Sequence, residues 1–103
     1  MYTATHSSHF AHDVKACKKK HWDMDVFKES IEAILRSDSE PIELRFDPHS
    51  LTGVLKGKRA VHVPTKDDPP SGTWVIVYEV IDDEAMFYRT GTHDVYGQVK
   101  GKH

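Results

Sequence analysis

The residues best suited to chemistry are three histidines and one arginine, each at a junction between predicted elements. They are His49, His62, Arg89 and His93. Histidine is the side chain whose ordinary pKa permits proton transfer in both directions near neutral pH. A single histidine is more often a hydrogen-bonded structural residue. Three of them, brought together with an arginine by the fold, would form a proton-transfer centre at strand ends and loops, where functional residues tend to lie.

A second group of histidines near the N-terminus has a different spacing. His6, His9 and His12 recur at every third residue. A structural zinc site usually recruits cysteines or a closed set of four ligands, and Cys17, the only cysteine, falls on an apolar helix face. The spacing therefore favours a solvated cluster, and we expect neither a metal nor another cofactor.

The N-terminal half of the chain predicts two helices. Ser7 or Ser8 is a suitable cap for the first, and Phe10, Val14 and Cys17 follow the spacing of one buried helical face. The second begins near a cap at Asp23 and carries a stripe of four apolar residues, Phe27, Ile31, Ile34 and Leu35. Because the link is only a few residues long, the two helices should form an antiparallel hairpin.

The C-terminal half predicts strands that would carry the candidate residues. Residues 55–63 alternate, with Lys58, Ala60 and His62 on one face. The run WVIVYEV, residues 74–80, is apolar on both faces and therefore central, and residues 85–90 return as its hairpin partner. The opening residues 1–6 alternate weakly, as in a short edge strand. We expect a single α+β domain over residues 1–103, with a helical hairpin packed on a small antiparallel sheet.

Composition limits the classes of function. The net charge is −2, so the chain is not a strongly basic nucleic-acid binder overall. Residues 23–47 carry a net charge of −5 and the remainder +3, while five bases against one acid lie between Arg45 and Lys66. One cysteine excludes a disulfide framework and fits a reducing, cytoplasmic setting. No apolar run approaches the about 20 residues of a membrane span, and no signal-peptide pattern opens the chain.

Four stretches, in order along the chain, resemble the RelE superfamily of bacterial toxins, and specifically its YafQ-like branch. They are FAHDVKACKKKHWDMDVFKESIEAIL, DPHSLTGVLKGKRAVHV, WVIVYEV and FYRTGTHDVYG. The resemblance implies the toxin of a type II toxin–antitoxin system, a ribosome-dependent endoribonuclease (mRNA interferase) that cuts messenger RNA in the ribosomal A site. It implies a cognate antitoxin, and operator DNA binding only through the antitoxin complex.

The resemblance also implies roles for individual residues. RNA supplies its own nucleophile, the 2′-hydroxyl, so the protein needs a general base, a general acid and a cation at the phosphoryl oxygens. His93 is expected to be the general acid and Arg89 to stabilise the phosphorane, while either His49 or His62 is the base, with His49 preferred. The implied set of catalytic residues is His49, His62, Arg89, His93 and Tyr96. The implied set of RNA-binding residues is Lys56, Lys58, Arg59, Asp67 and Trp74.

Several features depart from the family pattern and keep alternatives open. The segment PTKDDPPSGT stands before Trp74, so Asp67 or Asp68 does not clearly reach the site. Trp74 and Tyr78 share a face of a central strand, which favours core packing over RNA stacking. The alternative functions are a non-catalytic protein of the same fold that inhibits DNA gyrase, and a degenerate toxin that acts only as antitoxin partner or co-repressor.

Overall fold

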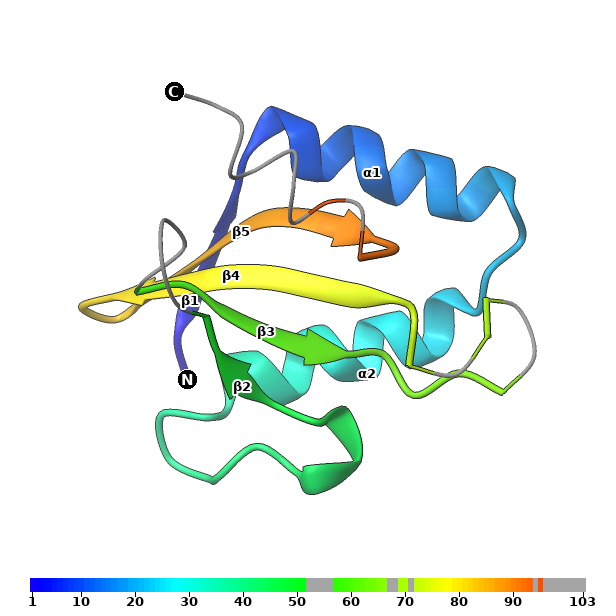
Figure 1. Ribbon diagram of the computed structural model, residues 1–103. Coiled ribbons are helices and arrows are strands. Elements are labelled where there is room, and N and C mark those ends of the chain that lie inside the picture. Colours follow the sequence, from blue (N-terminus) through cyan, green and yellow to red (C-terminus); the bar gives the residue numbers. More distant parts are fainter. Residues whose placement is uncertain (52–56, 67–68, 71, 94, 96–103) are drawn as a thin grey trace.

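The computed structural model describes residues 1–51, 57–66, 69–70, 72–93 and 95 of the chain (Figure 1). Two helices and a five-stranded sheet make up an α+β fold, which confirms the predicted class. In chain order the elements are β1 (Thr3–His6), α1 (Ser8–Lys19), α2 (Met24–Leu35), the 3-10 turn η1 (Leu44–Phe46), β2 (His49–Ser50), β3 (Arg59–His62), β4 (Val75–Ile81) and β5 (Glu84–Gly91).

Both helices begin at the predicted caps. The Ser7 hydroxyl accepts a hydrogen bond from the Phe10 backbone N–H at 3.1 Å, and the Asp23 carboxylate accepts from Asp25 and Val26. These bonds satisfy backbone donors that the first turn of a helix leaves without partners. The chain reverses between the two helices, and they run in opposite directions (Figure 1). The helical hairpin is therefore confirmed.

The sheet has the strand order β1-β5-β4-β3-β2. Strands β2 to β5 pair antiparallel, as predicted. However, β1 pairs with β5 in parallel, so the sheet is mixed and the prediction of a purely antiparallel sheet was incomplete. Alternation in residues 1–6 indicates a strand, but it carries no information on direction because side chains alternate identically in both cases.

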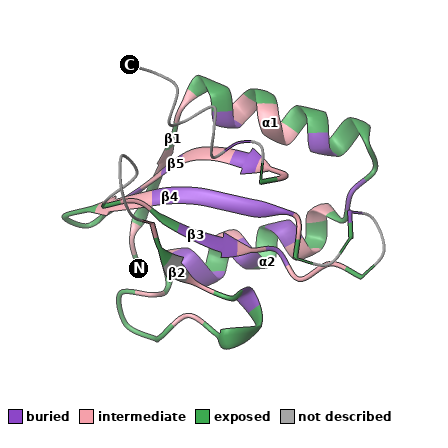
Figure 2. Cartoon of the chain, in the orientation of Figure 1, coloured by how far each residue is buried: buried purple, intermediate pink, exposed green. Residues whose placement is uncertain are grey.

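The main core lies between the sheet and both helices. Trp74 is fully buried there, with its ring stacked on Phe27 at 5.3 Å between centroids and against Trp22 at 4.9 Å. Central strand β4 is buried along most of its length (Figure 2). A smaller apolar cluster lies on the opposite face of the sheet and consists of Val75, Val77 and Val95, with Leu51 and Tyr88 against it.

We call this second face the open face, because both helices pack on the other one. Strand β3 alternates as predicted: Val61 enters the main core, while Ala60 and His62 lie on the open face opposite Val77 and Val75 of β4. Within the described residues, no helix combines the length and the apolar character that crossing a membrane requires.

Candidate active site

Two of the predicted catalytic histidines meet on the open face. The Nε2 atoms of His62 and His93 lie 3.3 Å apart, and their ring centroids are 5.3 Å apart. Val75 of β4 explains this meeting, because it pairs with His62 on one side and with Gly91 on the other. The ends of β3 and β5 are thereby held on either side of one residue, and His93 follows two positions after β5 ends.

Gly91 shapes the segment that carries His93. Its φ of +145° is a conformation that side-chain-bearing residues rarely adopt. A Cβ atom at this position would also meet Val95 Cγ1 at 3.3 Å. The glycine therefore allows the chain to turn after β5 and to return His93 toward His62.

Asp47 lies on the other side of the His62 ring. Its Oδ2 atom is 3.0 Å from His62 Nδ1, and the His62 side chain is only 15% exposed. The charge pattern marked Asp47 only as the one acid among the five bases between Arg45 and Lys66. The signal that could have found it is its place two residues before His49, in the motif DPHSLTG.

His49 lies close to the pair along the backbone. In the sheet, His49 of β2 pairs with Ala60 of β3, and Ala60 lies two positions before His62. The side chain of His49 is outside what the structure describes, so its catalytic role stays a prediction.

Arg89 binds a carboxylate of α1. Its Nε and Nη2 atoms donate to Asp13 at 2.7 and 2.9 Å, and Asp13 also accepts from the Thr90 backbone N–H at 3.1 Å. These hydrogen bonds to Asp13 raise the pKa of Arg89 above its ordinary value, against the lowering effect of burial. A β-bulge adds Tyr88 between the pairs Val77–Arg89 and Tyr78–Phe87, and bulges redirect neighbouring side chains. No pattern in the sequence pointed to Asp13.

The predicted RNA-binding residues divide between the two faces. Lys58 belongs to the open face, and its Nζ atom lies 4.9 Å from the centroid of the Tyr88 ring. The Tyr88 hydroxyl donates to Glu79 at 2.7 Å. Burial is the larger cause, and the hydrogen bond to this carboxylate the smaller one, that together raise the pKa of Tyr88 to about 12. Arg59 pairs with Tyr78, whose side chain is in the main core, so it lies on the other face.

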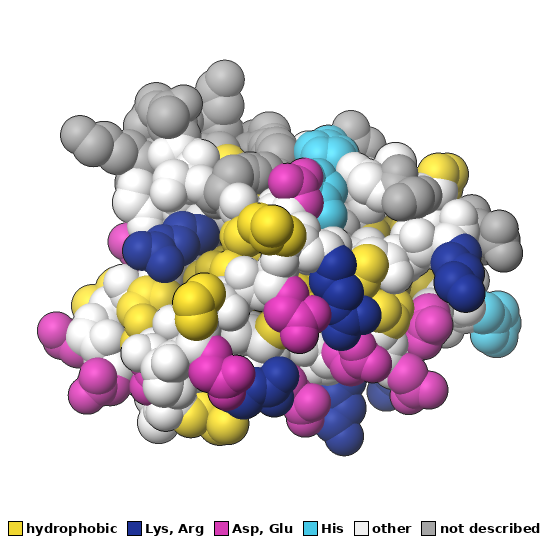
Figure 3. Space-filling model, turned by 90° about the horizontal axis from the view of Figure 1, so that it is seen from below, with side chains coloured by type: hydrophobic (Ala, Val, Ile, Leu, Met, Phe, Trp, Pro, Cys, Tyr) yellow, Lys and Arg dark blue, Asp and Glu magenta, His cyan; other side chains and the backbone are white. Residues whose placement is uncertain are grey.

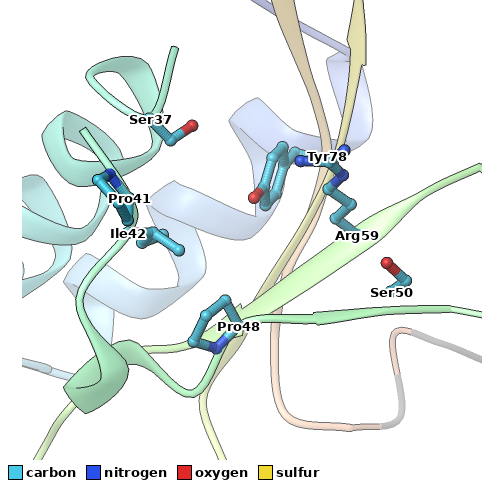
Figure 4. A pocket seen from close by; sticks show the side chains of 7 residues that line it. All are labelled: Ser37, Pro41, Ile42, Pro48, Ser50, Arg59 and Tyr78. Carbon is cyan, nitrogen blue, oxygen red and sulfur yellow. The ribbon is translucent and has the colours of Figure 1, made fainter. Parts of the chain in front are cut away.

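Arg59 lines a pocket of about 360 Å³ rather than the histidine pair (Figure 4). Burial raises the pKa of Tyr78, which contributes its hydroxyl to the pocket wall. Neither His62 nor His93 lines this pocket. Its residues are Ser37, Pro41, Ile42, Pro48, Ser50, Arg59 and Tyr78.

Trp74 is not available to RNA, so that prediction was wrong. Its side chain is completely buried, and its indole N–H donates to the Thr90 hydroxyl at 2.9 Å. The apolar alternation of β4 places it in the core, as the face-sharing argument favoured. The other predicted site residues, Lys56, Asp67 and Tyr96, are outside the described part of the chain.

Neither a metal site nor a reactive thiol adds to this picture. Across the described ranges, no three His, Cys, Asp or Glu side chains are grouped so that they could hold a metal ion. Burial raises the pKa of Cys17 to about 11, which makes its thiol a packing residue of α1 rather than a nucleophile.

The sequence and the fold of the chain match one family of proteins. The family model described as "Bacterial toxin of type II toxin-antitoxin system, YafQ" matches residues 2–96. The mRNA interferase toxin YafQ of Escherichia coli K12 is 33% identical over 88 residues, which are 85% of this chain and 87% of the relative.

Solved structures agree with this match. The crystal structure of YafQ from E. coli BL21(DE3) has a TM-score of 0.75 at 28% identity and covers 93% of this chain and 98% of its own. The crystal structure of the E. coli DinJ–YafQ toxin–antitoxin complex has a TM-score of 0.73 at 30% identity, with 91% and 94% covered.

Proposed function

Because the chain belongs to the YafQ family of bacterial type II toxins, we propose that it is an mRNA interferase whose active centre is the His62–His93 pair. The observation that carries this proposal is the 3.3 Å contact between the two Nε2 atoms on the open face. Relatives in the family carry the name mRNA interferase toxin. Two imidazoles in mutual contact supply the donor and the acceptor of protons that metal-independent cleavage of RNA requires.

The reaction uses the 2′-hydroxyl of the messenger as nucleophile. A histidine base takes its proton, the oxygen attacks the adjacent phosphorus, and the bond to the 5′-oxygen breaks as His93 donates a proton to it. The products are a 2′,3′-cyclic phosphate and a 5′-hydroxyl. The base is His49 or His62. Each of the two proton transfers contributes about 10²–10⁴-fold.

The scissile phosphate must enter between groups that touch each other in the free chain. His62 is held at the end of β3, whereas His93 is exposed and lies beyond the end of β5. A movement of His93 would open the pair for the phosphate. Arg89 would stabilise the phosphorane through Nη1, since Nε and Nη2 are bound to Asp13.

The proposal includes three partners. They are a cognate antitoxin, the ribosome with the translated message in its A site, and operator DNA reached only as the antitoxin complex. Two solved neighbours are complexes of DinJ with YafQ, which supports an antitoxin for this chain. Such a toxin acts in the cytoplasm, where translation takes place.

The test is inducible expression of the wild type, His62→Ala and His93→Ala in a bacterial host, with mapping of the 5′ ends of cellular messages. Wild type should cut translated messages in frame, within codons. His93→Ala should fold normally, because its side chain is exposed, and should lose toxicity and about 10²-fold or more of its cleavage.

His12→Ala is the matched control, because His12 is an exposed histidine on α1. It should remain toxic. Full toxicity of His93→Ala without message cleavage would instead identify a binding toxin, such as a gyrase inhibitor. A wild-type chain without any toxicity would identify a degenerate co-repressor.

A further inference from the structure

The His62 ring lies between two groups, one at each of its two ring nitrogens. Nε2 contacts His93 at 3.3 Å, and Nδ1 has the Asp47 carboxylate at 3.0 Å. Nδ1 is shielded from water, whereas the Asp47 side chain is 75% exposed. A charged acceptor at Nδ1 favours the tautomer that carries its proton there.

The backbone at Asp47 is held in an unusual conformation. Its φ and ψ are 47° and 58°, in the left-handed region, where it caps η1 and donates its N–H to the Leu44 carbonyl at 2.8 Å. Few residues with a side chain adopt this region, and the following Pro48 restricts the residue before it further. Buried Phe46 on one side and the pairing of β2 with β3 on the other hold the conformation in place.

We propose that Asp47 is a positioning residue that keeps the proton of neutral His62 on Nδ1 and thereby makes Nε2 the general base of the cleavage reaction. This inference rests on the proposed function and deepens it, since it selects His62 over His49 as the base. In the free chain the contact has the distance of an ion pair without the alignment of a hydrogen bond. The exposed carboxylate can turn into line when substrate binds, as catalytic hydrogen bonds often do.

The proton balance of the step is simple. Nε2 of His62 takes the 2′-hydroxyl proton, and the resulting imidazolium keeps its second N–H on Nδ1, which lies 3.0 Å from the Asp47 carboxylate. The 2′-oxygen bonds to phosphorus, the bond from phosphorus to the 5′-oxygen breaks, and protonated His93 supplies the proton of the leaving group. Asp47 contacts no reacting atom and takes up no proton. It acts only through the His62 ring, whose orientation and charge it influences.

The experiment compares Asp47→Gly with Asp47→Asn. Glycine and asparagine both tolerate the left-handed backbone, so both variants should fold, which thermal unfolding checks. Asparagine keeps an acceptor oxygen but loses the charge, while glycine removes both. The two readouts are the ¹⁵N chemical shifts of the His62 ring, which report which nitrogen carries the proton, and the rate of cleavage of translated message.

Asp47→Gly should move the His62 proton to Nε2 and slow cleavage by about 10-fold or more, a part of the contribution of general base catalysis. Asp47→Asn should keep the proton on Nδ1 and lose less activity. If Asp47→Gly cleaves as fast as the wild type, the proposal is overturned. If Asp47→Gly fails to fold, an Asp47→Asn chain with wild-type cleavage and a proton on Nε2 overturns it.

The proposed function and the positioning role of Asp47 can be refuted by different results. If wild type and His93→Ala leave message equally intact, the proposed function is wrong. The ring shifts then still decide on Asp47, because an unchanged tautomer in Asp47→Gly overturns its positioning role. If wild type cleaves and His93→Ala does not, but Asp47→Gly keeps the full rate, only the role of Asp47 is wrong.

Discussion

Arg89 and Asp13 form the most enclosed ion pair among the described residues. Their side chains are 12% and 14% exposed, and they are 76 residues apart in the sequence. The pair joins α1 to the end of β5 that leads to His93. An enclosed charge that loses its partner is costly, because water cannot replace the lost bonds.

Asp13→Asn should therefore lower the free energy of unfolding by about 3 kcal/mol. The amide still offers an oxygen to the Thr90 N–H, but it carries no charge opposite Arg89. Chemical denaturation measures the change. Asp82→Asn is the control, since Asp82 is an exposed turn residue. It should change stability by less than about 0.5 kcal/mol. Equal losses in the two variants would show that the ion pair contributes nothing.

The residues of the candidate site were predicted unequally well. His62 and His93 could be found because histidine chemistry and the motif around them are visible in the sequence. Asp47 and Asp13 could not be assigned, because each acts through a contact set by the fold: one by a left-handed turn, the other by the approach of α1 to β5. A carboxylate on a polar surface segment looks the same with or without such a contact.

At the scale of elements, Thr90 ties the start of β4 to the end of β5. Its hydroxyl accepts from the Trp74 indole N–H and donates to the Val75 carbonyl, both at 2.9 Å. Thr90 is 2% exposed and Trp74 is fully buried. The link therefore fixes the strand ends between which the histidine pair forms.

Thr90→Val should reduce the free energy of unfolding by about 1–3 kcal/mol, because it keeps the shape but leaves the buried indole N–H without an acceptor. Thr90→Ser retains the hydroxyl and should recover most of this loss. Thermal unfolding of both variants provides the measurement. A valine variant as stable as the serine variant would contradict a role for the hydroxyl.

Elements with strong local signals were predicted well, namely the capped helices and the apolar strand β4. Two features escaped. The turn η1 buries Phe46 within a segment that is rich in prolines and acids and has no regular apolar pattern. The parallel direction of β1 depends on a partner strand about 80 residues away, which no local pattern encodes.

Over the whole molecule, one side is rich in exposed acids, while Asp47 and Glu79 lie beside the open-face residues His62 and Tyr88. Exposed acids on α2 and the segment after it cover the side seen in Figure 3, with Lys and Arg among them. Among these acids are Asp25, Glu29, Glu32, Glu40 and Glu43. Lys58 lies on the open face with the histidine pair. If RNA binds the open face as proposed, the acids of α2 lie away from it.

Lys58→Ala should weaken binding to ribosomes carrying message and reduce the salt dependence of the binding constant by about one unit of slope. The measurement uses a salt series in a His93→Ala background, which leaves the message uncut. Lys28→Ala, an exposed lysine of α2, should leave the slope unchanged. An equal effect of the two changes would point to general charge instead of contact at the open face.

The pairing of β1 with β5 joins the first strand of the chain to the last. During synthesis, residues 3–6 must wait without their partner while the rest of the polypeptide is made. Residues 84–91 are made long after residues 3–6, and α1 gains its ion pair with Arg89 only then. β1 can therefore join the sheet only after β5 has been made, and pairing across so long a stretch of sequence is typical of slow folding.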